Sequence, residues 1–346
     1  MDGANRVRAG VTGVLAALTV AGLAACAGGE PAGNAVSTGH PRIAVVIKGV
    51  DNQFFQAMRD GIEDSGAASG TSVTVQAATA ITDTTGQADK LSGLAGQDYG
   101  CYLVNPISGT NLVQGIAQLA ASGRAIVNID SPVDPIAARA VGARIATYIG
   151  TDNVAAGAMA ARRLAALLPP SGGEVAVVGG IAGDVTSGNR IQGFVGALGP
   201  GIRVVQTAAA DWDRQQALTK ATDILAASPR VAGFFAANDD MGLGVARAVA
   251  NAGRVGQVQV VSVDGNPDAL AAVRSGELAA TVAQYPYAIG EMGVDACRAA
   301  ASGASLPTKV DAPVALITTD DVDRAIAAAP KPFTEYTNPF PALIKK

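Results

Sequence analysis

The sequence predicts an α/β protein with two doubly wound lobes, each built on a parallel sheet that helices cover on both faces. Its 346 residues exceed the length at which a single hydrophobic core usually stops growing, so two domains are the first expectation. Short apolar segments alternate along the chain with longer helix-like stretches. Continuously apolar strands that alternate with amphipathic helices are typical of parallel sheets buried on both faces. These strands are too numerous for one modest sheet, which favours two lobes.

The predicted strands form two groups along the chain. The first group is 42–47, 72–78, 101–106 and 125–130, and the second is 174–180, 203–209, 231–239, 258–265, 278–284 and 312–318. Segment 143–150 closes the first group, and a helix opens directly after it at Thr151 and Asp152. Asp152 suits the N-cap of that helix, because its side chain can accept a bond from a free backbone N–H. We therefore place the first boundary between the lobes near Gly150.

Composition excludes several classes of function. The formal net charge is −4 and the body of the chain has no run of Lys or Arg, which argues against a nucleic-acid-binding surface. The single histidine, His40, precedes the first predicted strand and has no active-site neighbours there. Histidine metal sites and Ser-His or Cys-His catalysis are therefore not expected. We predict no catalytic residue, no metal and no cofactor.

The N-terminal residues have the pattern of an export signal. Arg6 and Arg8 precede an apolar run, 11–23, which leads into the stretch LAAC that ends at Cys26. A short basic region, a hydrophobic segment of this length and small residues at its end are typical of a cleaved signal rather than of a spanning helix. LAAC resembles the bacterial lipobox, which implies cleavage before Cys26 and a lipid on that cysteine. The alternative is an ordinary secretory signal with a chance cysteine. The Gly/Ala/Ser/Pro-rich segment that follows, 27–40, is interpreted as a flexible tether.

Polar residues recur where predicted strands end, which is where ligands bind in open α/β sheets. They are Asn105, Asp130, Asn238, Asp264 and Gln284, and beside them stand Asn52, the aromatic pair Phe54 and Phe55, and Trp212. Neighbouring positions at a helix start point in different directions, so one core cannot easily take both phenylalanines. Amides and carboxylates exchange hydrogen bonds with adjacent hydroxyl groups, and aromatic rings cover the C–H face of a saturated polyol. The set predicts a small, uncharged, hydroxyl-rich ligand.

These positions also have purely structural interpretations. An Asn or Asp at a strand end is often the N-cap of the following helix, so any one of them alone is equally well explained as a cap. Asp239 and Asp240 open a predicted helix, where acidic side chains complement the helix dipole, and we do not interpret them as a catalytic pair. At least one of Phe234 and Phe235, which lie within a strand, belongs to the core.

Residues 41–318 resemble the type I periplasmic sugar-binding proteins, and within that family the ribose-binding type. The resemblance depends on ordered stretches along the chain: DNQFFQAMRDGIED, LVNPISG, IVNIDSP, IGTDNVAAGAMAA, NRIQGF, AADWDRQQAL, FAANDDMGLGVARA, VVSVDGNPDA and LAATVAQYPYAIGEMGV. It implies two lobes joined by a three-strand hinge that close over a monosaccharide. It also implies lobe boundaries at 41–150 with 285–312 and at 151–284 with 313–330, followed by a C-terminal tail, 331–346.

The resemblance assigns a set of residues to the cleft between the lobes. They are Lys48, Asn52, Phe54, Phe55, Asn105, Asp130, Ser131, Arg190, Trp212, Asn238, Asp264 and Gln284. In the family an aromatic residue from each lobe sandwiches the sugar, which implies that Trp212 faces at least one of the two phenylalanines.

Three positions depart from the ribose-binding pattern. Ser131 stands where the family has an arginine, and Gly188, two residues before Arg190, stands where it has a second one. Lys48 replaces a small polar residue at the end of the first strand. Two guanidinium groups that bind hydroxyls bidentately are therefore absent, and one ammonium group is added. These changes argue against ribose as the ligand and favour another sugar or, slightly more, an acyclic sugar alcohol.

The function that the resemblance implies is extracytoplasmic capture of a sugar or sugar alcohol for an ABC importer. The partners would be a permease, its ATPase subunits and the outer face of the cytoplasmic membrane through a lipid anchor, with a monomeric chain and no nucleic acid. A sugar-sensing receptor without a transport role is the alternative; a repressor with this body would begin with a helix-turn-helix. An exported enzyme that uses carboxylates is not favoured, because the sequence has no activated nucleophile and no metal cluster. A glycosidase would need two carboxyl groups facing one bond at a defined separation, and an assay on glycosides tests this alternative.

Two cysteines remain besides Cys26. Cys101 begins a strand of the first lobe, and Cys297 lies on a helix that the resemblance returns to the same lobe. Exported proteins are oxidised, so a disulfide is one expectation and two buried thiols are the other. Spacing along the chain does not supply the Cα separation that a disulfide requires, so both remain open.

Overall fold

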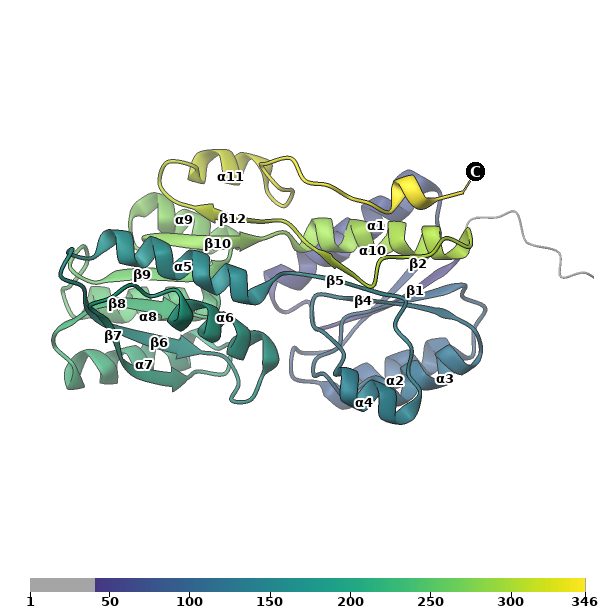
Figure 1. The fold of residues 1–346 in the computed structure, drawn as a ribbon, viewed down its shortest axis with the longest axis horizontal. Coiled ribbons are helices and arrows are strands. Elements are labelled where there is room, and N and C mark those ends of the chain that lie inside the picture. The colour runs from purple at the N-terminus through teal and green to yellow at the C-terminus, as the bar shows by residue number, and fades with distance from the viewer. Residues whose placement is uncertain (1–40, 346) are drawn as a thin grey trace, which may run out of the picture. The chain divides into compact units, whose positions relative to one another are not determined.

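The computed structural model describes residues 41–345, and the predicted signal segment 1–26, with Cys26, and the tether 27–40 lie outside that range. Within it the chain folds around two six-stranded sheets, each flanked by helices (Figure 1). The predicted α/β class with two lobes is confirmed.

The first sheet has the order β11-β5-β4-β3-β1-β2, and all of its strand pairs are parallel. Its strands are β1 (Ile43–Ile47), β2 (Val73–Ala77), β3 (Cys101–Val104), β4 (Ala125–Ile129), β5 (Thr147–Gly150) and β11 (Lys309–Asp311). The strand order reverses beside β1, and crevices at such reversals bind ligands in open α/β sheets. The sequence did not predict β11, which is short and half-exposed and so lacks the apolar run of the other strands.

The second sheet has the order β12-β10-β9-β8-β6-β7. Its strands are β6 (Gly173–Gly179), β7 (Ile202–Ala209), β8 (Val231–Ala236), β9 (Gln259–Asp264), β10 (Ala280–Gln284) and β12 (Val314–Ile317). Contrary to the expectation of a purely parallel sheet, β12 runs antiparallel to β10, with Val314 opposite Gln284. The reason is the direction of the chain: β10 ends where the chain leaves this lobe, whereas β12 begins where the chain re-enters it.

Alternating side chains of the first sheet pack into two separate cores, as the pleat of a strand requires. Ile43, Val45 and Ile47 face α1 and α10, whereas Ala44 and Val46 face α2 and α3. The helices of this lobe are α1 (Gln53–Ser69), α2 (Thr84–Ala95), α3 (Val113–Ala121), α4 (Pro135–Val141) and α10 (Pro286–Ala301).

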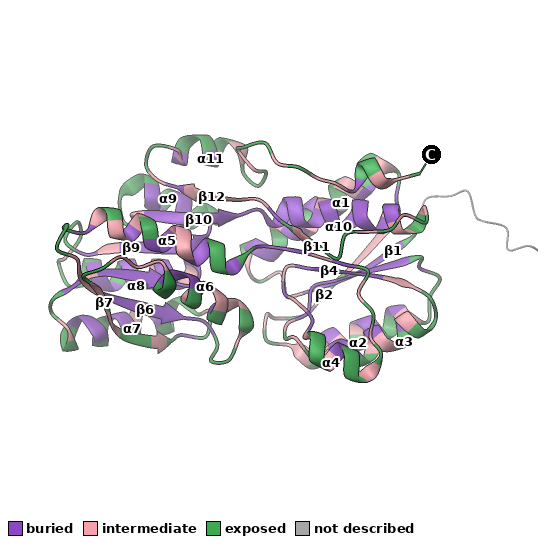
Figure 2. Ribbon diagram, in the orientation of Figure 1, coloured by how far each residue is buried: buried purple, intermediate pink, exposed green. Residues whose placement is uncertain are grey.

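The second lobe has one continuous core that extends over both faces of its sheet. Figure 2 shows its strands buried beneath helices whose outer surfaces are exposed. The helices are α5 (Asn153–Leu167), α6 (Val185–Gly196), α7 (Arg214–Ala227), α8 (Asp239–Asn251), α9 (Pro267–Ser275) and α11 (Val322–Ala328). Asp152 caps α5 as predicted, since its side chain accepts the N–H of Ala155 at 2.9 Å.

The chain passes between the two sheets three times: after β5, after β10 and between β11 and β12. After α11 it returns to the first lobe, where a short 3₁₀ turn (Pro341–Leu343) lies against α10. Tyr336 donates to Glu291 at 2.7 Å, Asn338 donates to Asp295 at 2.9 Å, and Phe340 is fully buried. Residues 338–345 are thus packed on the first lobe, whereas Phe333 packs against the core of the second lobe and Tyr336 contacts both cores.

Cys101 and Cys297 form a disulfide bond, with their Cα atoms 5.6 Å apart. The bond joins the start of β3 to α10, and both residues are fully buried. Of the two alternatives that the sequence left open, the structure therefore has the disulfide. Among residues 41–345, no helix combines the length and the apolar character needed to cross a membrane.

Candidate functional site

Loops at the carboxyl ends of both sheets surround a cavity of about 380 Å³. Its wall contains every predicted cleft residue except Asn105, and both lobes contribute to it. A cavity of this size, with a mixed apolar and polar wall, is in the usual range for small-molecule sites.

Backbone strain is concentrated at this cavity. Within residues 41–345, the non-glycine residues with positive φ are Asp130 (58°), Asp211 (52°), Trp212 (64°) and Asp264 (140°). Three of these four line the cavity. Residues held in such conformations cost about 1–3 kcal/mol each and cluster at ligand sites, where the surrounding structure over-determines them.

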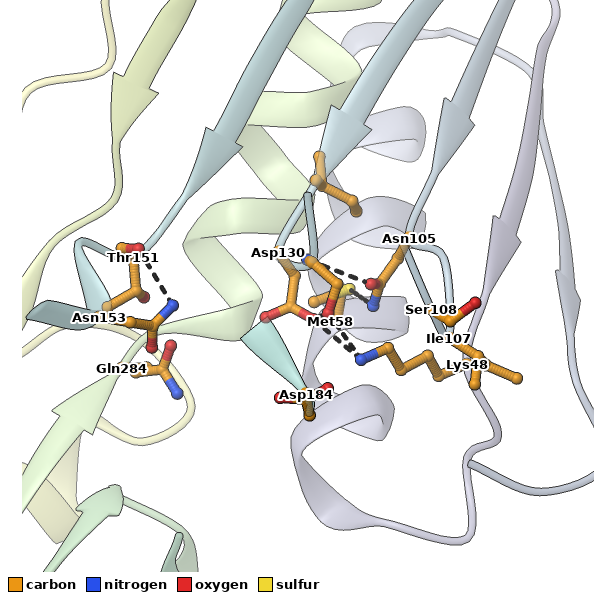
Figure 3. A network of polar contacts seen from close by, with 12 residues as sticks. Lys48, Met58, Asn105, Ile107, Ser108, Asp130, Thr151, Asn153, Asp184 and Gln284 are labelled. Atoms are coloured by element: carbon orange, nitrogen blue, oxygen red, sulfur yellow. Dashed lines mark hydrogen bonds and ion pairs between the residues drawn. The ribbon is translucent and has the colours of Figure 1, made fainter. Parts of the chain in front are cut away.

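Lys48, Asp130 and Ser131 form the polar wall of the first lobe. Lys48 Nζ donates to Ser131 Oγ at 2.6 Å and lies 4.0 Å from Asp130 Oδ2, and Figure 3 shows its ammonium directed at Asp130. Burial raises the pKa of Asp130, while the charges of Lys48 and Arg190 act in the opposite direction. The lysine therefore stands beside the position where the family resemblance implied an arginine.

Asn105 lies beneath this wall rather than on it. It is fully buried; its Oδ1 accepts the N–H of Ser131 at 3.4 Å, and its Nδ2 lies 3.5 Å from the sulfur of Met58. The sequence predicted Asn105 in the cavity wall, but in the structure Asn105 does not line the cavity. Asn105 supports Asp130 and Ser131 from below because it belongs to the neighbouring strand, which ends one layer deeper.

Arg190, Asp264 and Gln284 form the polar wall of the second lobe. Asp264 Oδ1 accepts from Arg190 Nη1 at 3.1 Å and from Gln284 Nε2 at 2.7 Å. Arg190 is also fixed by Asn153 Oδ1 at 2.8 Å and by the carbonyl of Ala237 at 2.6 Å. Burial raises the pKa of Asp264 to about 7, against the opposing effect of the guanidinium.

Several atoms of this wall have no partner within residues 41–345. Asp264 uses only Oδ1 and Arg190 uses only Nε and Nη1 in these hydrogen bonds, so Asp264 Oδ2 and Arg190 Nη2 stay unused. Oε1 of Gln284 is buried without a partner in the described part of the chain. A buried polar atom such as Gln284 Oε1 costs about 1–3 kcal/mol when it is unpaired. Together the three atoms offer both acceptors and a donor, which favours a ligand that both donates and accepts.

Asn238 and Asn52 are helix caps as well as cavity residues. Asn238 Oδ1 accepts the N–H of Met241 at 2.9 Å and caps α8. Asn52 Oδ1 accepts the N–H of Phe54 at 2.8 Å and caps α1, while its Nδ2 donates across to Asp240 Oδ2 of the second lobe at 3.2 Å. Each of these two residues is therefore both a helix cap and a residue of the cavity wall. The Nδ2 group of Asn52 is engaged in the hydrogen bond to Asp240 between the lobes.

The three predicted aromatic residues lie in the cavity wall. Phe54 and Phe55 meet edge to face with ring centroids 5.2 Å apart, and Lys48 Nζ lies 5.4 Å from the Phe55 ring. Trp212 comes from the second lobe, with the Arg190 guanidinium 5.8 Å from its ring. A side chain at Gly180 would overlap the indole, so glycine is required beneath Trp212.

Sequence reasoning missed the loop residues of the wall. They are Ile81, Thr82, Thr84, Ile107, Ser108, Ile181, Ala182, Gly183, Asp184 and Thr186. They lie after β2, β3 and β6, in the loops and in the first turns of α2 and α6. The ends of β2 and β6 carry no conspicuous amide or carboxylate, and the end of β3 carries only Asn105. The rule that ligands bind at carboxyl strand ends would have found these loops if it had been applied to every strand.

The cavity lies between two lobes, and its wall offers both hydrogen-bond donors and acceptors to a ligand. This arrangement defines a two-lobed solute-binding protein. No group of three or more His, Cys, Asp or Glu side chains that could hold a metal ion occurs within residues 41–345.

The chain belongs to the periplasmic binding protein domain family, whose model matches residues 43–305. It is 38% identical over 253 residues to the D-allose-binding periplasmic protein of Escherichia coli, covering 72% of this chain and 81% of that protein. It is 30% identical over 276 residues to the ribose import binding protein of Bacillus subtilis, covering 80% and 87%.

A solved structure gives the same result. An ABC transporter periplasmic solute-binding protein from Actinobacillus succinogenes, with bound D-allose, matches with a TM-score of 0.77 and 28% identity, covering 82% of this chain and 99% of that one. The predicted type I periplasmic sugar-binding family is thus confirmed, and with it an extracytoplasmic, non-enzymatic component of ABC sugar transport. The comparisons favour this function over the alternative of a receptor without a transport role.

Proposed function

We propose that this protein captures a small, neutral sugar or sugar alcohol between its lobes and presents it to the permease of an ABC importer. The observation that carries the proposal is the set of unused polar atoms in the cavity wall, which offers donors and acceptors side by side. Hydroxyl groups both donate and accept, so a polyhydroxylated ligand can pair with all of them.

The residues have separate roles in this proposal. Asp130, Asp264 and Gln284 accept from hydroxyl groups, whereas Lys48, Arg190 and Asn238 donate to them, with Ser131 able to do either. Phe54, Phe55 and Trp212 cover the apolar faces of the ligand from opposite lobes. Asn105 acts from below through Asp130 and Ser131, and Asn52 acts through its bond to Asp240. Charge-assisted hydrogen bonds of this kind contribute about 1.5–3 kcal/mol each.

Capture proceeds by hinge closure. The rigid units are 41–150 with 285–312 and 151–284 with 313–330, and residues 338–345 of the C-terminal tail move with the first. A ligand that contacts both lobes favours the closed state over the open one. The hydrogen bond from Asn52 to Asp240 supports this, since it joins the lobes, and Arg214 holds Asp240 Oδ1 at 2.7 Å and Asp268 at 3.2 Å.

The identity of the ligand is tested with Lys48. We expect Lys48→Ala to weaken binding of the natural ligand by about tenfold or more, because one charge-assisted bond is lost. We also expect D-ribose to bind weakly or not at all, while another compound among aldoses, ketoses and alditols binds in the micromolar range or tighter. Trp212 is the single tryptophan of the chain and lines the cavity, so its fluorescence reports binding directly.

Two controls sharpen this experiment. Lys48→Met keeps the alkyl stem beside Phe55 and removes only the charge, and Lys220→Ala removes an exposed lysine of α7. Tight ribose binding by ligand-stripped protein, indifferent to both Lys48 variants, would contradict the assignment of Lys48. Failure of the whole panel to bind would contradict the proposed function itself.

We further propose that the protein is a monomeric lipoprotein, exported by the signal at 1–26 and held at the outer face of the cytoplasmic membrane through Cys26. The extracytoplasmic character of the family supports export. The LAAC pattern supports the lipid, and the diacylglyceryl unit supplies the two acyl chains that stable anchoring requires. Its partners would be the permease, to which it delivers the ligand, and through the permease the ATPase subunits.

Fractionation tests the anchor. We expect Cys26→Ala to move the protein from the membrane pellet to the soluble fraction or the medium, because no acylated residue remains. Lys220→Ala serves as the control, since it changes an exposed side chain and leaves the lipobox intact. Wild-type protein that is fully soluble after export would refute the lipid anchor, though not the function of the cleft.

A further inference from the structure

Asp239 is a buried carboxylate that the ligand site does not use directly. It is fully buried in the first turn of α8. Its Oδ1 accepts the hydroxyls of Ser262 at 2.5 Å and Thr281 at 2.7 Å, and its Oδ2 accepts the backbone N–H of Asn266 at 2.7 Å. One side chain thus links α8, two neighbouring strands and the turn after β9.

That turn holds Asp264 in a conformation that favours glycine. Asp264 has φ 140°, and Gly265 after it has φ 78°. Such a backbone persists only when surrounding bonds over-determine it. Both N–H groups that follow Asp264 are tied to Asp239: Asn266 directly, and Gly265 through Thr281 Oγ1 at 3.2 Å.

The position of the Asp264 carboxylate depends on this turn. Ala283 of β10 pairs with Asp264, so the backbone of Asp264 is also fixed on its β10 side. Its Oδ1 is held by Arg190 and Gln284, which leaves Oδ2 for the ligand. If the turn relaxed to an ordinary φ, the carboxylate would leave this arrangement.

We propose that Asp239 is a positioning residue for ligand binding, which holds the strained turn 264–266 so that Asp264 presents its carboxylate to the cavity. This role deepens the proposed function and rests on it, because it acts through Asp264. The helix-dipole interpretation drawn from the sequence describes only part of the role of Asp239. A carboxylate that merely complemented a dipole would not need to be buried among three donors.

The first test needs no ligand. In Asp239→Ala, hydrogen exchange at the amides of Gly265 and Asn266 should become faster than in the wild type, while strands β6 and β8 keep their protection. Thr281→Val removes the link to Gly265 at nearly constant volume and should speed exchange at Gly265 alone. Unchanged protection of both amides in these variants would overturn the proposal, whether or not the cavity binds a sugar.

The second test measures affinity with the tightest-binding compound of the sugar and alditol panel. Asp239→Ala should weaken binding by about tenfold or more, the effect expected when a binding group is displaced by a fraction of an ångström to an ångström. In an Asp264→Ala background the same change should add little, because the group through which Asp239 acts is already absent. Independent, additive losses would overturn the proposal.

Asp295→Ala is the matched control, and Asp239→Asn is the rescue. Asp295 is also buried, but it binds Arg298 and Asn338 away from the cavity, so its loss should destabilise the fold without weakening binding. Asn at 239 keeps an acceptor for the Asn266 N–H and should restore most of the affinity. If Asp239→Ala does not fold, Thr281→Val carries the test, and wild-type amide exchange at Gly265 in that variant would overturn the role.

Discussion

Replacing Arg190 by alanine is expected to abolish measurable ligand binding and to destabilise the second lobe by about 3–5 kcal/mol, the usual cost of removing one partner of a buried ion pair. Arg190 is 4% exposed and bonds to Asn153, to Ala237 and to Asp264. Without it, the Asp264 carboxylate would remain buried with no opposing charge, and the ligand would lose a donor and a correctly placed acceptor together.

Calorimetric titration and chemical denaturation measure the two effects separately. Arg203→Ala is the matched control, because Arg203 pairs with Glu174 on the same lobe but is largely exposed, so its loss should change little. An Arg190→Ala protein with near-wild-type affinity would remove this ion pair from the ligand site.

The pKa of Asp264 gives the same variant a pH signature. Because burial raises that pKa to about 7, the folded state holds the proton more tightly than the unfolded chain, and this carboxyl contributes less to stability as pH rises from about 4 to 7. The ionised form is the better acceptor, so wild-type affinity should increase as pH rises through 7. Arg190→Ala removes the charge that lowers this pKa, so in that variant the pH-dependent loss of stability should extend to higher pH, as denaturation at several pH values would measure.

Much of the fold could be predicted because it depends on local patterns. Every predicted apolar segment became a strand, since a buried parallel strand needs only a short apolar run. The antiparallel direction of β12, whose strand itself was predicted, and the short strand β11 could not be predicted, because their partners are set by where the chain crosses between lobes. The apolar content of a segment does not indicate where the chain crosses from one lobe to the other.

The site was predictable to the extent that strand ends carry its chemistry. Asp130, Asp264 and Gln284 reach the cavity because each directly follows or ends a strand. Asn105 also directly follows a strand, but it lies one layer below the cavity wall. Its depth depends on the register between β3 and β4, which the sequence does not give. The bond from Asn52 to Asp240 and the role of Asp239 depend on contacts between distant segments, which spacing cannot supply.

Breaking the disulfide between Cys101 and Cys297 is expected to lower the free energy of unfolding by about 2–5 kcal/mol, because the bond closes a very long loop in the unfolded chain. The two cysteines are 196 residues apart, so this loop contains the entire second sheet except β12. The bond ties α10, which the chain reaches only after building the second lobe, to a central strand of the first. Ligand affinity should change little, since neither cysteine lines the cavity.

A double-mutant cycle with Cys101→Ala and Cys297→Ala distinguishes the disulfide from two packed thiols. If the bond exists, either single substitution already breaks it, so the double variant should be hardly less stable than each single one. Two unlinked thiols would instead give separate losses that add, apart from their mutual contact. Denaturant unfolding measures these free energies, with fluorescence titration of Trp212 confirming that the cavity still binds. Mass spectrometry of the non-reduced protein that found both thiols free would rule out the bond directly.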